Sequence, residues 1–243
     1  LKKSSILRGP DIYFQEEHVL PLVHIGFFFP GGRAKESAKN AGITELMLRV
    51  LFQNAAGRID SWNKLEESGV EITFVNEIDF FGIRGVLLSN QVEAFFKTLL
   101  EWVRRPVVTE IDLNVERQRM LEILERERED PLLVRIDAAR KQIFPKHPYG
   151  LNRYGTTKSV SSLNFESVQG WLGSQMSNIH PLIVVRGDIK GTSFLQNFIS
   201  DLSDSKREKR DPIIVESVKS PQNSVLETEG REFLLISKGP SKG

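Results

Sequence analysis

The chain has 243 residues, and 40% of them are hydrophobic, which is enough for one large domain or two small domains with a buried core. Its 33 basic and 32 acidic residues give a formal net charge of +1, and this balance argues against nucleic acid or an anionic membrane as the primary partner. The absence of cysteine excludes disulfides, thiolate metal sites and thiol nucleophiles.

Hydropathy predicts a soluble protein. No segment approaches the roughly 18 apolar residues that a membrane-spanning helix needs, so we expect no membrane span. The chain begins with Leu1, so an export signal could have been removed by processing or trimming. The compartment is left open, and a bacterial-type cytoplasm and a periplasm are both compatible with these residues.

Two strands are predicted at the start of the chain, over residues 11–16 and 21–29. The apolar run Leu22–Phe29 is typical of a buried central strand, which the following Pro30-Gly31-Gly32 ends. His24 stands alone in this run. A lone histidine among apolar residues is more often a hydrogen-bonded core residue than a ligand, and we expect that role for His24.

The next predicted element is an amphipathic helix over Asn40–Phe52, which contains a glycine, Gly42, at its entry. Glu45 and Arg49 lie four residues apart in this stretch, in the order that stabilises a helix by a few tenths of a kcal/mol. If this face of the helix is partly buried, each charge also offsets the desolvation of the other. We therefore predict an ion pair between Glu45 and Arg49.

A capped short helix over residues 60–69 follows, and then two strands, Val70–Val75 and Ile78–Leu88, with a polar turn at Asn76-Glu77. This spacing predicts a hairpin. Residues 90–104 form a predicted helix with one apolar stripe.

The longest predicted helix begins at Thr109, whose hydroxyl can cap a first turn that contains acidic residues, and it ends at Pro131. Its alternating arginine and glutamate residues indicate a solvated face. The side that packs carries Leu113, Met120, Ile123 and Leu124. Further helices are predicted over residues 132–144, 162–176 and 194–202, and strands over 180–188 and 231–237, with an exposed linker between residues 203 and 212.

Several short motifs occur in order around the predicted helix over Asn40–Phe52, on the long helix and beyond it. They are Phe28–Arg33 with Glu36, Ala41-Gly42-Ile43, Leu51-Phe52, Glu116-Arg117, Asp130-Pro131, His147–Gly150, Gly155-Thr156, Ser162-Leu163 and Val184–Asp188. In this order they resemble the landmarks of the pitrilysin/insulinase-type (M16) metallopeptidases over roughly Ile6 to Leu202.

The resemblance places the family's zinc motif, H-x-x-E-H, on the predicted helix over Asn40–Phe52. The first histidine falls on Glu45, the general-base glutamate on Leu48 and the second histidine on Arg49. The third zinc ligand, seven residues beyond Glu116, falls on Ile123, and the adjacent Glu122 is rotated by about 100° on a helix and cannot replace it. Glu116 itself matches an acid that supports the zinc site and would here have nothing to support. The resemblance therefore implies that zinc is lost, so we expect no metal and no cofactor.

The fold implied by the resemblance is an α+β two-layer sandwich, with a mostly antiparallel sheet and helices packed on one face, known as the LuxS/MPP-like metallohydrolase fold. Full-length relatives have two such halves that face each other around a chamber. Residues 1–203 would form the N-terminal M16-like domain, and residues 204–243 the linker and opening strand of a second, absent domain.

The function implied is that of a non-catalytic homologue that serves as the partner or peptide-binding subunit of an active zinc peptidase. Its partner would be a homologous M16 subunit or a second M16-like half. Relatives bind the substrate backbone along an edge strand, which falls here on Gly69, Val70, Glu71, Ile72 and Thr73. Glu71-Ile72 stands where the family usually has Asn-Ala, so we treat peptides as an open partner class.

Two alternatives remain. One is a metallopeptidase with a relocated site built from the scattered histidines, although no two of them lie at metal-binding spacing. These are His18, His24, His147 and His180. The other is a structural adaptor in which the cluster Lys206–Arg210 binds an acidic partner, although its interspersed glutamate favours plain solvation.

Overall fold

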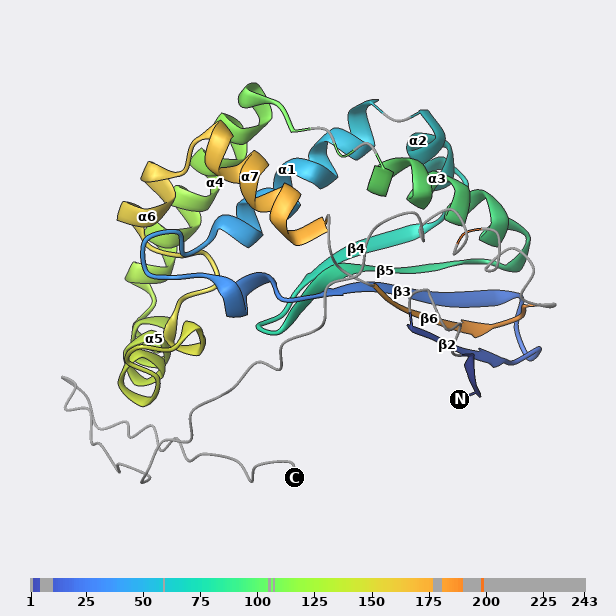
Figure 1. Cartoon of the computed structure of the whole chain (residues 1–243), viewed down its shortest axis with the longest axis horizontal. Helices are drawn as coiled ribbons and strands as arrows, with labels where there is room; N and C mark the ends of the chain where they lie inside the picture. Colours follow the sequence, from blue (N-terminus) through green and yellow to red (C-terminus); the bar gives the residue numbers. More distant parts are fainter. Residues whose placement is uncertain are drawn as a thin grey trace.

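In the computed structural model, the described residues are 2–4, 11–58, 60–104, 106, 108–176, 181–189 and 198. Helices lie over one face of a single twisted sheet, as Figure 1 shows. The predicted linker at residues 204–243, its strand over 231–237 and the cluster Lys206–Arg210 lie outside the described residues, and so does the predicted helix over 194–202 apart from Phe198.

Within the described part of the chain, the sheet contains six strands in the order β1-β2-β6-β3-β5-β4. All neighbouring pairs are antiparallel except β2 and β6, which run parallel. The strands are β1 (Lys2–Ser4), β2 (Asp11–Glu16), β3 (Leu22–Pro30), β4 (Glu71–Asn76), β5 (Phe80–Leu88) and β6 (Leu182–Gly187). The fold class predicted from the sequence, a two-layer α+β sandwich with a mostly antiparallel sheet, is confirmed.

The helical layer contains seven α-helices among the described residues. They are α1 (Ile43–Arg58), α2 (Asp60–Glu67), α3 (Val92–Arg104), α4 (Glu110–Glu129), α5 (Pro131–Ile143), α6 (Thr157–Ser162) and α7 (Phe165–Met176). Three short 3₁₀ turns are described as well: η1 (Gly32–Lys35) leads from β3 into α1, η2 (Ser89–Gln91) leads from β5 into α3, and η3 (Pro148–Gly150) lies between α5 and α6.

Local capping explains where several helices begin. The side chain of Thr109 accepts a hydrogen bond from the backbone N–H of Asp112 and starts α4, as predicted. The helix expected over residues 162–176 corresponds to α7, whereas α6, which precedes it, was not predicted. Thr156 and Ser159 form a reciprocal capping box that starts α6, and Leu163 is extended, so α7 begins only at Phe165.

The core lies between the sheet and α1. The predicted amphipathic character of this helix is wrong for its first turns, because residues 41–48 are all buried. Leu46, Met47 and Leu48 are fully buried, and α1 packs against α2, α4, α7 and β4. A helix that is buried on all sides tolerates charge only where partners compensate it. Glu45 is therefore the residue of α1 whose surroundings must be explained.

His24 does not have the predicted role of a core residue. On β3 the side chains alternate, and His24 is exposed on the sheet face that the helices leave open, whereas Val23 and Ile25 face the core. The strand is apolar on both faces over much of its length, so the hydrophobic run hid the period of two that separates its faces.

A candidate site on helix α1 and its charge network

The entry of α1 is held by a buried acid. Glu36 is 4% exposed, and its two carboxylate oxygens accept hydrogen bonds from the backbone N–H groups of Gly42 (2.9 Å) and Thr44 (3.0 Å). Burial raises the pKa of Glu36, and these backbone hydrogen bonds oppose the rise. The sequence identified Glu36 as a family landmark but not as the cap of this helix.

Gly42 is required at this entry. Its φ is 91°, and a Cβ at this position would lie 2.6 Å from the carbonyl oxygen of Tyr154. No other residue meets both conditions without strain. The contact fixes the segment around Tyr154 against the first turn of α1.

Glu45 is fully buried and has partners on three different segments. Its Oε1 accepts a hydrogen bond from Arg49 Nε at 2.9 Å, which confirms the predicted ion pair. Its Oε2 accepts from Arg153 Nε at 2.9 Å and from Asn76 Nδ2 at 2.7 Å. Charge-assisted hydrogen bonds of this kind offset the cost of burying the carboxylate.

Arg49 also faces a second acid. Its Nη1 lies 3.7 Å from Oε2 of Glu116 on α4, and Glu116 is 2% exposed. The other oxygen of Glu116 accepts a hydrogen bond from Arg119. The prediction that Glu116 has nothing to support is therefore wrong, because it compensates Arg49 and Arg119.

Tyr154 closes this network on one side. The guanidinium carbons of Arg49 and Arg153 lie 5.6 Å and 5.7 Å from the centre of its ring. These are cation–π distances, at which the face of the ring attracts both charges. Two arginines from distant parts of the chain are thus held beside one carboxylate and one ring.

The residues at this place do not fit a zinc ion. Leu48, at the position of the general base, is fully buried and has no group that could activate water, and Ile123 is a partly buried apolar residue of α4. The guanidinium of Arg49 is always protonated and carries only donors, so it cannot ligate a cation. Glu122 is exposed, as its rotation on α4 predicts. Across the described part of the chain, no group of three or more histidine, aspartate or glutamate residues could hold a metal.

Sequence reasoning missed three members of this network: Asn76, Arg119 and Arg153. Arg153 lies 108 residues from Glu45, so no helical or strand period connects them. The sequence offered one electrostatic signal: the resemblance places Glu45 and Glu116 at the same site, and two buried acids need more than the one cation that Arg49 supplies.

The predicted peptide-binding residues lie at the start of β4. This strand is the last in the sheet order, and no described strand pairs with its outer edge. Gly69, with a φ of 86°, turns the chain from α2 into the strand, and Val70 is buried. Glu71 and Thr73 are exposed on the open face, whereas Ile72 is half-buried on the helix side.

The pairing of β4 with β5 determines which backbone groups are free. Glu77 N donates to Phe80 O at 2.9 Å, in the same register as the β4–β5 pairs. Hydrogen-bonded pairs in an antiparallel ladder recur at every second residue. The N–H and C=O groups that point away from β5 are therefore those of Ile72, Phe74 and Asn76. Of the five predicted residues, only Ile72 directs both of its backbone groups outward from the strand.

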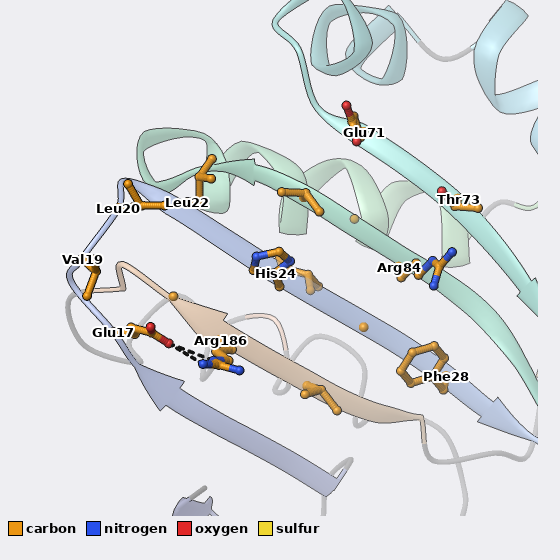
Figure 2. Close-up of a pocket in the computed structure, with 16 residues that line it drawn as sticks. Glu17, Val19, Leu20, Leu22, His24, Phe28, Glu71, Thr73, Arg84 and Arg186 are labelled. Carbon is orange, nitrogen blue, oxygen red and sulfur yellow. Dashed lines mark hydrogen bonds and ion pairs between the residues drawn. The ribbon is translucent and has the colours of Figure 1, made fainter.

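The open face of the sheet forms a broad hollow of about 820 Å³ (Figure 2). It extends from Glu71 and Thr73 on β4 past Arg84, His24 and Phe28. At its far side Arg186 donates a hydrogen bond to Glu17, with Nε at 2.9 Å from Oε2. Helices do not cover this face in Figure 1.

The three histidines that the structure describes do not converge. The Nδ1 atom of His18 lies 2.7 Å from Asp188 Oδ1 in an exposed pair, and His24 lies in the open-face hollow. His147 accepts a hydrogen bond from Tyr149 N and starts η3. His180 lies outside the described residues.

No protein-family model matches the chain. Among curated proteins, the chain is similar to the non-peptidase homolog YmxG of Helicobacter pylori, with 20% identity over 182 residues that cover 74% of this chain and 42% of that protein. Among solved structures, it is similar to a peptidase M16 inactive domain from Pseudomonas fluorescens, with a TM-score of 0.74, 18% identity, and coverage of 86% of this chain and 52% of that one. A chain of Complex III2 from Candida albicans gives a TM-score of 0.63 and 17% identity over 87% of this chain and 48% of that one.

The chain thus spans about half the length of these similar proteins, or less. Within the described residues, no helix combines the length and apolarity needed to cross a membrane. The sheet order and the helical layer agree with these similarities: the chain has the fold of the peptidase M16 inactive domain, and its sequence is similar to that of a non-peptidase homolog.

Proposed function

We propose that this chain is a non-catalytic M16 homologue that acts as the partner or peptide-binding subunit of an active zinc peptidase. The observation that carries the proposal is the place of Arg49, whose guanidinium lies between the buried carboxylates of Glu45 and Glu116. A zinc peptidase needs neutral ligands and a water-activating carboxylate at this place. A fixed cation and the apolar Leu48 supply neither.

The comparisons support the non-catalytic part of this proposal. The curated relative is described as a non-peptidase homolog, and the Pseudomonas fluorescens structure as an inactive M16 domain. The charge network offers a physical reason for keeping the fold without the metal. Arg49 supplies positive charge beside two buried acids, so the packing of α1 against α4 does not require an ion.

A partner role is supported by the surfaces that the described residues leave open. The chain spans about half of the similar proteins, and the sheet face opposite the helices is uncovered. This face carries the hollow of about 820 Å³, and the large apolar side chains of Val19 and Leu20 are exposed at its rim. We infer that a second M16-like half or a homologous subunit covers this face, since burying such side chains stabilises an assembly.

Zinc content and peptidase activity test the non-catalytic role. The 243-residue chain is dialysed against metal-free buffer, then against zinc, and its bound zinc is measured by plasma emission. We expect far less than one zinc per chain and no peptide cleavage. Near-stoichiometric zinc with histidine ligation, or cleavage that 1,10-phenanthroline inhibits, would overturn the proposal and favour the relocated site.

The partner role is tested by mixing the chain with a homologue from the same genome that retains an intact H-x-x-E-H motif. Native mass spectrometry should show a complex of the two. Charge reversal within the open face, Arg84→Glu, should weaken it, because Arg84 is exposed in the hollow. Arg126→Glu, on the exposed face of α4, is the matched control and should leave the complex intact. Recovery of the chain alone, at concentrations at which the active homologue forms dimers, would contradict this role.

A further inference from the structure

Three arginines gather near the end of the edge strand β4. They are Arg33 in η1, Arg140 in α5 and Arg153 in the segment after η3. Arg33 is half-buried, yet its guanidinium group forms no hydrogen bond or ion pair with any described residue. A guanidinium carries five N–H donors, so an arginine that is buried without partners has lost water contacts and gained no others.

The other two arginines are also only partly used. Arg153 is 41% exposed and bonds Glu45 through Nε, while its two terminal amino groups form no hydrogen bond to a described residue. Nη1 of Arg140 lies 3.8 Å from Asp137 Oδ1, beyond hydrogen-bonding distance, and the other oxygen of Asp137 lies 2.6 Å from Lys141. Donors from three guanidinium groups therefore remain available.

The acids near this cluster are already engaged. Burial lowers the pKa of Arg33, and the positive charges of Arg153 and Arg140 lower it further, while Glu36 and Glu45 oppose this. Both oxygens of Glu36 accept backbone hydrogen bonds, and both oxygens of Glu45 accept side-chain hydrogen bonds. Glu77 attracts Arg153 but is exposed and forms no ion pair with it among the described residues.

The cluster lies at the Asn76 end of β4. Asn76, the last residue of this strand, shares Glu45 Oε2 with Arg153. The turn between β4 and β5 is tied to η1, because Gly31 N donates to Asp79 O and Ala34 N donates to Ile78 O, both at 2.7 Å. Tyr149 of η3 bonds the carboxylate of Asp79 at 2.7 Å. The unpaired arginine donors therefore lie where the free edge of β4 ends.

We propose that this edge binds an extended peptide whose carboxylate is held by Arg33, Arg140 and Arg153. The outward N–H and C=O groups of Ile72 and Phe74 pair with the peptide backbone, and the guanidinium groups recognise its negative charge. The carboxylate is that of an aspartate or glutamate side chain or that of the peptide's own C-terminus. This inference rests on the proposed non-catalytic, peptide-binding role.

The test compares three synthetic peptides that share one alternating Val/Thr core, titrated into the 243-residue chain by calorimetry. The first has glutamate at both ends with blocked termini, the second has glutamine in the same places, and the third has glutamine with a free C-terminal carboxylate. We expect the first or the third to bind at least about fivefold more tightly than the second, because charge-assisted hydrogen bonds are the stronger kind. This advantage should shrink between about 50 and about 300 mM salt.

Variants locate the carboxylate. Arg33→Gln should reduce the preference to below about twofold without lowering the melting temperature, because the side chain of Arg33 has no hydrogen-bonding partner to lose among the described residues. Arg126→Gln makes the same change on the exposed face of α4 and should leave the preference unchanged. Two further peptides carry N-methyl groups at alternate residues, one at the odd positions and one at the even positions, so that each lacks the N–H donors on one edge. One of the two should bind poorly, because its missing donors are those that would face β4.

The outcomes separate this inference from the proposed function. Equal binding of the glutamate, glutamine and free-carboxylate peptides, or a preference that survives in Arg33→Gln, overturns the carboxylate site alone. Failure of all three peptides to bind overturns the site and the peptide-binding role together, while the partner role stands. Zinc-dependent cleavage of the peptides overturns the non-catalytic role and leaves the carboxylate preference to be judged by the same three affinities.

Discussion

Arg49 lies one helical turn beyond Glu45 and donates a hydrogen bond from Nε to Oε1 at 2.9 Å, while its Nη1 lies 3.7 Å from Glu116 on a neighbouring helix. One side chain thus compensates two buried acids that belong to two elements. Arg153 and Arg119 supply the remaining positive charge, one to each acid. The site is therefore balanced by side chains alone, and each charge in it has a testable role in stability.

Removing Arg49 should destabilise the chain. In Arg49→Met, Glu45 and Glu116 stay buried and lose a shared cation. Breaking a buried pair costs about 3–5 kcal/mol, and because Arg153 and Arg119 remain we expect a loss of about 2–3 kcal/mol in the free energy of unfolding. Urea denaturation measures it. Arg126→Met, on an exposed face, should stay within about 0.5 kcal/mol of the wild type.

The interaction between the two partners can be isolated by a double-mutant cycle. Glu45→Gln and Arg49→Met, alone and combined, should show a coupling free energy of about 1–3 kcal/mol. In Glu45→Gln the guanidinium of Arg49 has already lost the Glu45 charge, so its removal should cost less than in the wild type. Additive effects would mean that Arg49 contributes only packing against Tyr154.

Glu36 should make stability depend on pH. Burial raises its folded pKa above the ordinary value of 4.5, so the acid favours folding most below that value, and this contribution is lost as pH rises through the folded pKa. The wild type should therefore lose stability relative to Glu36→Gln as pH rises from about 4.5 towards neutrality. Denaturation of both proteins across this range measures it. If the stabilities of the two proteins change in parallel with pH, the folded pKa of Glu36 is not raised.

Restoring the motif should restore metal binding if the site is placed correctly. The combined change Glu45→His, Leu48→Glu, Arg49→His and Ile123→Glu supplies two imidazoles and a carboxylate as ligands, with a second carboxylate beside them. We expect this variant to retain zinc in metal analysis, whereas the same variant with Arg49 kept should retain little. A folded restored variant, with a wild-type circular dichroism spectrum and no zinc, would show that these four positions do not converge.

The aromatic cluster around Phe52 of α1 should contribute strongly to stability. Phe52 packs against Trp62, Phe74 and Trp102, with ring centres 5.2–5.8 Å away. Because Phe52 is only partly buried, Phe52→Ala should cost about 3 kcal/mol, at the lower end of the range for phenylalanine truncation. Thermal denaturation measures this loss. A cost below about 1 kcal/mol would indicate that the cluster repacks around the cavity.

Much of the architecture could be predicted from local patterns. The threonine cap of α4, the β4–β5 hairpin, the stripe of α3 and the Glu45–Arg49 pair all depend on residues within a few positions of one another, and the structure contains each of them. The errors arose where a pattern had two readings. The apolar run of β3 hid the exposed face that carries His24. The predicted start at Ser162 fell on the end of α6, a short helix that was not predicted, so α7 begins three residues later than expected.

The sequence alone determined the individual helices and strands, because periodicity is a local property of the chain. Its resemblance to the M16 peptidases implied the two-layer fold and the exchange of imidazole and carboxylate for Glu45, Leu48 and Arg49. Only the tertiary structure decided that Arg153 and Asn76 would meet Glu45, that Arg49 would also serve Glu116, and that unpaired arginine donors would collect at the end of β4. Burial removes water from these charges, so their partners are chosen by whichever segments the folded core brings within hydrogen-bonding distance, and sequence separation gives no measure of that distance.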